Sequence, residues 1–353
     1  MTILGIETSC DETAAAVVED GKSLLSNIVA SSMDLHAVYG GIVPEIAARN
    51  HIESIMPVIQ QSLEQAKTDW KDLDGIAVTY GAGLGGSLLI GVLTARTLAI
   101  IKNKPLYAIN HVEGHVYANF LTETNLPSYL LPHTSPQFPM LALIVSGGHS
   151  QLVLFRDHFN YTLLGQTHDD AIGEAFDKVA KVIGLPYPGG PSIEKAAPKG
   201  DPFAFNFPKA HLRKKYDFSF SGIKTAVLRA AQEIIGEDFN FPSHQIAKRL
   251  NEKQRLDIAA SFQRVAVETV IDKTVLAYEE FRPKSVVIGG GVASSLELRR
   301  QLSERLPIKI QYTDRKLCTD NGAMIATLGC FKAMHDQPKA DPYSLDISPN
   351  LTM

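Results

Sequence analysis

Two histidines four residues apart offer the most specific chemistry in this sequence. The segment Asn110-His-Val-Glu-Gly-His115 follows the apolar run Leu106–Ile109. If this segment is helical, both imidazoles project from one face, about one turn apart. The spacing is typical of a pair of metal ligands, although two histidines also share a helix face without binding a metal. A carboxylate from elsewhere would complete a two-histidine, one-carboxylate site with open coordination positions.

The acid between the histidines bears on the kind of metal site. Metalloproteases of the H-E-x-x-H type carry a glutamate directly after the first histidine, where it acts as general base. Here Glu113 comes two places after His111, so it leaves the helix at a different angle. Asn110 as N-cap and Glu113 at the third helical position also approximate a capping box. The pattern therefore disfavours a metalloprotease.

Three acidic segments carry further candidate site residues. Asp320, in Cys318-Thr-Asp-Asn-Gly322, opens a predicted helix and is either its N-cap or the third metal ligand. Asp11 and Glu12 lie at a predicted hairpin turn, where they could act as a base or position a metal-bound water. Asp177 lies on a predicted helix and is either a solvated acid or an acceptor for ribose hydroxyls.

Three glycine-rich loops stand at predicted strand ends, namely Gly81–Ser87, Ser146–Ser150 and Gly289–Ala293. Bare backbone at such loops lets a phosphate or a flat ligand approach closely, and N–H groups at a helix start can hold an anion. Each loop alone could be a tight turn, but three together favour a nucleotide site.

The first loop also satisfies G-x-G-x-x-G at Gly81, Gly83 and Gly86. A dinucleotide-binding fold needs in addition an acidic residue about 20 positions on. That neighbourhood reads Lys102-Asn-Lys-Pro105 and then Asn110, without a carboxylate. A nicotinamide-dependent dehydrogenase is therefore disfavoured.

Strand and helix patterns alternate along the chain, which predicts the α/β class. Several strands are continuous apolar runs, as expected where helices cover both faces of a sheet. The predicted strands are Ile3–Ile6, Ala15–Val18, Gly75–Tyr80, Leu106–Ile109, Leu141–Val145, Gln151–Phe155, Ser285–Ile288 and Ile308–Tyr312. The predicted helices are Pro44–Lys67, Ser87–Lys102, His111–Leu121, Asp170–Ile183, Ser221–Ile235, Lys253–Phe281, Ser295–Leu306 and Asn321–His335.

The sequence contains one internal echo. Ile3–Ser9 leads through a turn into Thr13–Val18, and Leu141–Gly148 leads through a turn into Gln151–Phe155. Each reads as apolar strand, small or polar turn, apolar strand. The echo predicts two similar domains around a ligand cleft. We place the first at residues 1–125, rejoined by the helix and tail at 326–353, and the second at 126–325.

Composition limits the partners and the compartment. The chain has 353 residues and a formal net charge of −4, so a nucleic acid would have to bind a local basic patch. The best patch is His211-Leu-Arg-Lys-Lys-Tyr216, and Lys248 with Arg249 is another. The sequence begins without a basic leader, its three cysteines are scattered, and Arg96 interrupts the longest apolar stretch. These features predict a cytoplasmic protein without a membrane partner.

Eight motifs together resemble the universal threonylcarbamoyl transferase family, which builds N6-threonylcarbamoyladenosine in tRNA. The resemblance extends from Gly5 to about Ala326. Its motifs are Gly5-Ile-Glu-Thr-Ser-Cys-Asp-Glu-Thr13, Gly41-Ile-Val-Pro-Glu45, His111-Val-Glu-Gly-His115, Val145-Ser-Gly-Gly-His149, Gly173-Glu-Ala-Phe-Asp-Lys178, Tyr187-Pro-Gly-Gly190, Phe218-Ser-Phe-Ser-Gly-Ile-Lys224 and Cys318-Thr-Asp-Asn-Gly322.

The resemblance implies an actin/hexokinase/Hsp70-like (ASKHA) fold and a metal-dependent acyltransferase. One divalent metal, Fe2+ or alternatively Zn2+, would be bound by His111, His115 and Asp320. Threonylcarbamoyl-AMP would be the substrate, and ATP or ADP could occupy the same cleft. The implied substrate-binding residues are Ile144, Val145, Ser146, Gly147, Gly148, Asp177, Gly190 and Ser295. At Ser295 the family has an asparagine, and serine offers one hydroxyl in place of an amide.

The implied reaction is transfer of the threonylcarbamoyl group to N6 of adenosine 37, with release of AMP. Asp11 or Glu12 would take the amine proton. The implied partners are tRNA, a paralogous protein of the same fold and a small ATPase, and we expect Pro44–Lys67 to dock the paralogue. The alternatives are a kinase or ATPase of the same fold, which needs no protein-held transition metal, and a non-catalytic scaffold, which would lack the three ligands.

Overall fold

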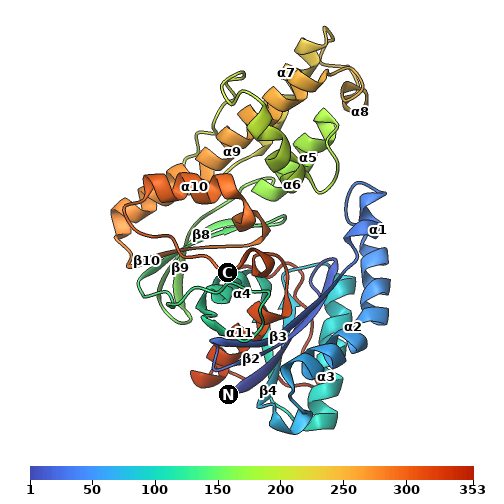
Figure 1. Ribbon diagram of the computed structural model, residues 1–353, viewed down its shortest axis with the longest axis vertical. Helices are drawn as coiled ribbons and strands as arrows, with labels where there is room; N and C mark the ends of the chain where they lie inside the picture. The colour runs from blue at the N-terminus through green and yellow to red at the C-terminus, as the bar shows by residue number, and fades with distance from the viewer. The chain divides into compact units, whose positions relative to one another are not determined.

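The computed structural model describes residues 1–353, which divide into two compact units (Figure 1). Unit 1 comprises Met1–Pro136 and Gln311–Met353, and unit 2 comprises Gln137–Ile310. The predicted domain borders after residues 125 and 325 differ from these limits. The stretch 311–325 belongs to unit 1 because it leads into a helix whose first residue, Gly322, lies against the backbone of Ala15.

Unit 1 is built on a six-stranded sheet of order β5-β4-β1-β2-β3-β6. Strand β1 pairs antiparallel with β2 and parallel with β4. Two of the strands, β3 and β6, were not predicted, because β3 is half-exposed and polar at its ends and β6 has only two residues. The strands are β1 (Thr2–Glu7), β2 (Glu12–Glu19), β3 (Ser23–Ser31), β4 (Gly75–Gly81), β5 (Leu106–Asn110) and β6 (Glu123–Thr124).

Helices cover both faces of this sheet. Successive side chains of a strand point to opposite faces. Leu4 and Ile6 pack in the core under α2 and α3, whereas Ile3 and Gly5 face α11. The α-helices of unit 1 are α1 (Met33–Ala37), α2 (Pro44–Ala66), α3 (Gly85–Lys102), α4 (His111–Tyr117) and α11 (Gly322–Met334), and its 3-10 turns are η1 (Trp70–Asp72), η2 (Ala118–Phe120) and η5 (Arg315–Leu317).

Helix α3 is long and apolar enough to cross a membrane if only length and composition are considered. In the structure, Leu88, Val92 and Ala95 of this helix are buried. The guanidinium of Arg96 binds main-chain carbonyls of the C-terminal segment. One face of the helix is therefore packed in unit 1, whereas Leu89 and Leu93 are exposed on another.

Unit 2 is built on a four-stranded sheet of order β10-β7-β8-β9. Its strands are β7 (Met140–Val145), β8 (Ser150–Asp157), β9 (Asn160–Gln166) and β10 (Ser285–Gly289). Its α-helices are α5 (Ile172–Ile183), α6 (Gly189–Ala196), α7 (Ser221–Ile234), α8 (Ser243–Ile246), α9 (Glu252–Phe281) and α10 (Leu296–Arg305), with 3-10 turns η3 (Ala197–Lys199) and η4 (Gly291–Ser294).

One predicted strand is wrong. Ile308–Tyr312 forms no β-strand, although Ile310 is buried. A short run rich in β-branched residues satisfies burial equally well without joining a sheet, and here tertiary packing overrides the propensity.

The internal echo is confirmed by the topology of the two sheets. In unit 1, β1 pairs parallel with β4 and antiparallel with β2, which pairs antiparallel with β3. In unit 2, β7 pairs parallel with β10 and antiparallel with β8, which pairs antiparallel with β9. The same strand plan therefore occurs twice in the chain, each time with a hairpin whose turn carries candidate site residues.

Candidate metal centre and phosphate loop

The two histidines of α4 are positioned by the N-cap of that helix. The side-chain oxygen of Asn110 accepts from the N–H groups of Val112 at 2.9 Å and of Glu113 at 3.5 Å. The helix begins directly at His111, so His111 and His115 share one face. Their rings meet edge to face, with centroids 4.7 Å apart. The predicted helical spacing is confirmed.

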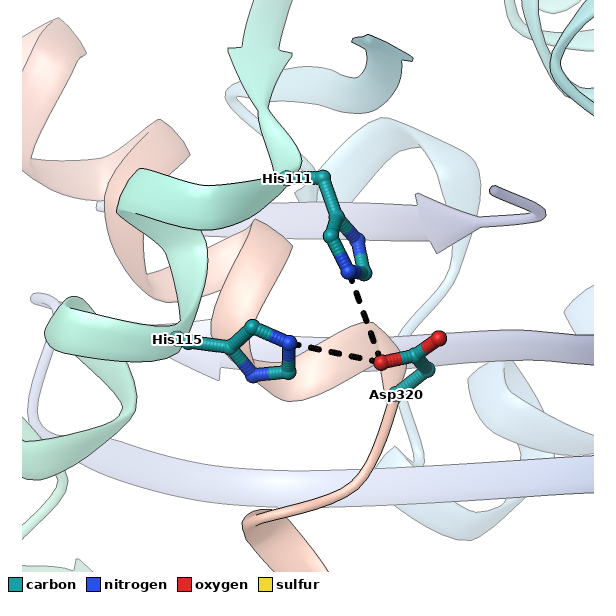
Figure 2. Close-up of side chains that lie close together, drawn as sticks. All are labelled: His111, His115 and Asp320. Carbon is teal, nitrogen blue, oxygen red and sulfur yellow. Dashed lines mark ion pairs between the residues drawn. The ribbon is translucent and has the colours of Figure 1, made fainter. Parts of the chain in front are cut away.

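Asp320 completes the constellation, as Figure 2 shows. Its Oδ1 lies 3.5 Å from Nε2 of His111 and 3.4 Å from Nε2 of His115. An ion with tetrahedral geometry and bonds of about 2.1 Å holds its ligand atoms about 3.4 Å apart. Of the two roles predicted for Asp320, that of N-cap is wrong, because Asn321 caps α11 and accepts from the N–H of Met324 at 3.0 Å.

The donor set fits a divalent transition metal. Both ring nitrogens of His115 are buried without a hydrogen bond. The contact of Nε2 with Asp320, at 3.4 Å, meets the distance limit of an ion pair but is not a hydrogen bond. Such orphaned nitrogens are rare in folded proteins and indicate a missing partner. Two imidazoles and one carboxylate are ligands that Fe2+ and Zn2+ accept with positions left open.

A buried carboxylate supports His111 from behind. Nδ1 of His111 lies 3.1 Å from Oγ of Ser9 and 3.3 Å from Oε2 of Glu7, which is the buried carboxylate. Burial by itself lowers the pKa of His111, but Asp320 and Glu7 outweigh it and raise that pKa to about 9. Carboxylate–histidine pairs of this kind orient metal ligands.

Glu7 was not recognised from the sequence as a site residue. It is fully buried, and its carboxylate also accepts from the N–H of Ser9 and the hydroxyl of Thr79. An acid at the end of the apolar strand β1 was the available signal, since a buried charge requires partners.

Asp11 and Glu12 lie where β1 turns into β2, and they belong to the same electrostatic environment. Burial, followed by repulsion from Asp320 and Asp11, raises the pKa of Glu12 to about 10. Glu12 is therefore protonated at neutral pH in the metal-free protein. A bound cation would favour its ionised form.

Glu113 belongs to a different environment. Burial raises the pKa of its carboxyl to about 7, and Lys332 opposes this shift. Burial, followed by the charge of Glu113, raises the pKa of Tyr80. One carboxyl oxygen of Glu113 is buried without a hydrogen bond. Glu113 thus interacts electrostatically with Lys332 and Tyr80 and is not among the residues of the metal-ligand cluster, which argues against a metalloprotease base.

In the glycine loop before α3, two main-chain N–H groups are already engaged, and whether the N–H groups at the helix start bind an anion stays a prediction. The N–H of Gly83 donates to the carbonyl of Pro349 at 3.1 Å, and the N–H of Leu84 donates to the carbonyl of Ser9 at 2.7 Å. The acceptors, Pro349 and Ser9, are both distant from this loop in sequence, so the local sequence could not reveal these bonds.

The turn between β7 and β8 has the form expected of a phosphate loop. The hydroxyl of Ser146 accepts from the N–H of His149 at 3.0 Å. Gly147 and Gly148 are exposed, with open space where a side chain would stand. Two more glycines lie tightly against this turn, because an added Cβ would stand 2.6 Å from Ser146 O at Gly173 and 2.4 Å from Val145 O at Gly290.

The other predicted substrate residues of unit 2 lie on separate elements. The side chains of Ile144 and Val145 are fully buried, so only their main chain could meet a ligand. Asp177 accepts from the N–H of Gly189 at 2.7 Å, and burial raises its pKa. Gly190 follows in the first turn of α6 with open space beside it.

Ser295 is the N-cap of α10. Its hydroxyl accepts from the N–H of Leu298 at 3.4 Å. The hydroxyl is therefore already engaged in capping, and the next N–H, of Leu296, donates to Glu194 at 2.6 Å. The role of Ser295 toward a substrate stays a prediction.

Comparison with known proteins identifies the family. Residues 23–327 match the family model of tRNA N6-adenosine threonylcarbamoyltransferase. A protein of that name from Thermomicrobium roseum is 50% identical over 92% of this chain and 90% of its own length. Another, from Desulfitobacterium hafniense, is 47% identical over 100% of this chain and 98% of its own length. The chain belongs to this family.

Solved structures of other proteins share the fold of this threonylcarbamoyltransferase family member. The component A of (R)-2-hydroxyglutaryl-CoA dehydratase from Acidaminococcus fermentans aligns over 95% of this chain and 99% of its own, with a TM-score of 0.51 and 17% identity. Full-length HypF aligns over 94% of this chain and 55% of its own, with a TM-score of 0.57 and 13% identity. The fold is actin/hexokinase/Hsp70-like, as the sequence resemblance implied.

Proposed function

We propose that this chain transfers the threonylcarbamoyl group from threonylcarbamoyl-AMP to N6 of adenosine 37, in tRNAs that read codons beginning with A. Family membership over almost the whole chain supports the reaction class. The observation that carries the proposal is the meeting of His111, His115 and Asp320 in one cluster. A kinase of the same fold needs no such cluster, and a scaffold would have no use for it.

The cluster would hold one divalent ion, Fe2+ in the first place and Zn2+ in the second. When bound, the ion would act as a Lewis acid toward an oxygen of the substrate. The ligand residues keep it in place, and Glu7 holds the imidazole of His111 with its Nε2 toward the ion.

Unit 2 would bind the activated substrate. N–H groups of Gly147 and Gly148 would stabilise negative charge on the phosphate, whereas that of Ser146 donates to the carbonyl of His149, and open space beside Gly147 permits close approach. Asp177 and Gly190 would contact the nucleoside part. ATP or ADP would bind the same residues, because they share the adenosine phosphate moiety.

The reaction forms one bond and breaks one. The N6 amine attacks the carbamoyl carbon, the bond from that carbon to the phosphate oxygen breaks, and AMP leaves with the electron pair. The amine loses a proton. We assign its uptake to Asp11 or Glu12, since a bound cation would favour the ionised, proton-accepting form of these carboxyl groups.

Transfer requires a bound tRNA and, in our proposal, two protein partners in the cytoplasm. Arg213 and Lys214 are exposed and would contact tRNA phosphates. Helix α2 exposes Ile52 and Met56 on one face, which suits docking of a paralogous protein of the same fold. A small ATPase would complete the assembly.

A single-turnover assay tests the proposal. Wild type, His111→Ala and His133→Ala are each loaded with Fe2+, given unmodified tRNA, threonylcarbamoyl-AMP and candidate partners, and assayed for modified adenosine and AMP. His133 is an exposed histidine outside the cluster and serves as matched control. We expect product from wild type and His133→Ala, and loss of both metal and product in His111→Ala. Absence of product from wild type, with substrate intact, would overturn the proposal.

A further inference from the structure

Residues 341–352 form a strap along unit 1 that is held by main-chain groups. Arg96 on α3 grips its first part, donating to the carbonyls of Pro342 at 2.7 Å, Tyr343 at 2.6 Å and Leu345 at 3.1 Å. A planar guanidinium that binds one backbone through all three of its nitrogens fixes the path of that backbone. Leu345 and Ile347 then pack against the hydrophobic core.

The strap continues across the carboxyl ends of β4 and β5. The N–H of Ser348 donates to the carbonyl of Tyr80 at 2.7 Å. An added Cβ at Gly81 would stand 2.1 Å from the carbonyl oxygen of Ser348, so the strap touches bare backbone there. Two further bonds follow, from the N–H of Gly83 to the carbonyl of Pro349 at 3.1 Å and from Nδ2 of Asn110 to the carbonyl of Thr352 at 3.1 Å.

Two separate routes lead from these bonds to His111. By the first, Asn110 binds Thr352 through its amide nitrogen while its amide oxygen caps α4, which begins at His111. One side chain thus joins the strap to the ligand helix.

By the second route, the loop that binds Pro349 also holds Ser9. The N–H of Leu84 donates to the carbonyl of Ser9 at 2.7 Å, and Gly83 lies so close that an added Cβ would stand 2.5 Å from that carbonyl. The hydroxyl of Ser9 lies 3.1 Å from Nδ1 of His111. Strap, loop and imidazole are therefore consecutive members of one chain of contacts.

We propose that residues 348–352, acting through Asn110 and Ser9, are positioning residues for the metal ligand His111. The consequence for metal affinity rests on the proposed function, whereas the rigidity of α4 does not. Groups that orient a ligand without touching the metal typically change its affinity about 10–100-fold when removed.

Two truncations test the strap in steps. A chain ending at Asn350 loses Thr352 and its bond to Asn110. A chain ending at Ile347 also loses the bonds of Ser348 and Pro349, but keeps the core contacts of Leu345 and Ile347. The matched control is full-length Asn350→Ala, whose exposed side chain makes none of these bonds.

Two readouts are needed. Amide hydrogen exchange in α4 of the metal-free protein reports local rigidity. Titration with Co2+, followed by its visible absorption, reports ligand geometry and affinity. We expect exchange in α4 to rise stepwise, by about 10-fold or more in the shorter chain, with α9 unchanged. Co2+ affinity should fall at least about 10-fold in that chain and stay unchanged in Asn350→Ala.

The variant Asn110→Ser adds an independent check, because serine also caps helices but is too short to keep the bond to Thr352. Its effect should not add to that of the truncation at Asn350, since both remove the same bond. If amide hydrogen exchange in α4 is unchanged in the chain ending at Ile347, residues 348–352 do not position His111 and the proposal is overturned. If the wild type binds no Co2+, the proposed metal centre is wrong. The exchange result still tests whether residues 348–352 hold α4 in place.

Discussion

The carboxyl groups around the imidazoles of His111 and His115 outnumber the positively charged groups that could balance them. Glu7 is fully buried, Asp11 nearly so, and Glu12 and Asp320 repel each other. Like charges removed from water are stable only with protons or a cation among them. The metal-free centre must therefore hold protons that a divalent ion would displace.

Glu12→Gln tests this through the pH dependence of stability. The pKa of Glu12 is raised from 4.5 to about 10, so above pH 4.5 the unfolded chain loses a proton that the folded chain keeps. Wild-type stability should fall as pH rises from about 5 toward 10. Metal-free Glu12→Gln should not lose stability in this way. At pH 8 its free energy of unfolding should exceed that of the wild type by more than about 1.4 kcal/mol.

Urea unfolding at pH 5 and pH 8 measures the difference between the two proteins. Saturating Zn2+ is the control, because a bound cation favours the ionised carboxylate and should reduce the gap. A gap that does not depend on pH would show that Glu12 is ionised in the folded protein.

Glu7→Gln tests the support behind His111. The amide keeps the size of the side chain but loses its charge, so it holds the imidazole less firmly. We expect metal affinity to drop about 10-fold or more, measured by competition with a chelator, while the fold persists. Glu19→Gln, an exposed acid at the end of β2, is the matched control. Equal affinities of Glu7→Gln and wild type would remove Glu7 from the centre.

At this scale the residue pattern alone predicted the ligand pair, whereas Asp320 as third ligand came from the family resemblance. The spacing of His111 and His115 is a local property of a helix, so it was readable. Asp320 could cap or coordinate, and only the neighbouring Asn321 decided between them by taking the cap. Glu7 was missed because its partners, Thr79 and His111, are distant in sequence.

The element that delivers Asp320 is α11, and glycines set its distance from the sheet. An added Cβ at Gly5 of β1 would stand 2.3 Å from Ala326 N, and one at Gly322 would stand 2.5 Å from the backbone of Ala15. Backbone lies against backbone at both places. Any side chain there would displace the helix and the aspartate before it.

Gly5→Ala should therefore lower the free energy of unfolding by about 3 kcal/mol or more, the upper range for overpacked cores. Its matched control is Gly222→Ala in the first turn of α7, where an added Cβ meets nothing within 4 Å. That change should be neutral or stabilise by up to about 1 kcal/mol. Chemical denaturation of both variants checks the pair, and similar values would contradict tight packing at Gly5.

Elements were predictable where their period was clear. The helices from Pro44 and Lys253 were predicted to within a residue or two, because apolar residues recur along them with helical spacing. Strands β3 and β9 were missed because polar residues interrupt them and both are partly exposed. The engagement of the N–H groups of Gly83 and Leu84 could not be predicted, since their acceptors, Pro349 and Ser9, are distant in sequence.

The whole molecule carries a net charge of −4, so a bound tRNA must find a local surface. Within the cluster of residues 211–216, Lys215 is paired with Glu280 and lies over the ring of Tyr216. Arg213 and Lys214 are exposed and have no such pairing. The effective charge of the cluster is therefore nearer two than three.

Replacing Arg213, Lys214 and Lys215 by alanine should weaken tRNA binding and reduce the slope of log affinity against log salt by about two. Filter binding at several salt concentrations measures both. Replacement of Lys195, Lys199 and Lys253 makes the same charge change on exposed positions elsewhere in unit 2. Equal losses in the two triple variants would assign the effect to net charge and remove the cluster as a contact.

The repeated strand plan has a consequence for electrostatics. The turn of the first hairpin carries the carboxylates Asp11 and Glu12, whereas the turn of the second carries Gly147 and Gly148 with bare N–H groups. The same hairpin thus carries acidic side chains at its turn in unit 1 and bare main-chain N–H groups at its turn in unit 2. The strand plan therefore does not fix the electrostatic character of a hairpin, which the few residues of each turn decide.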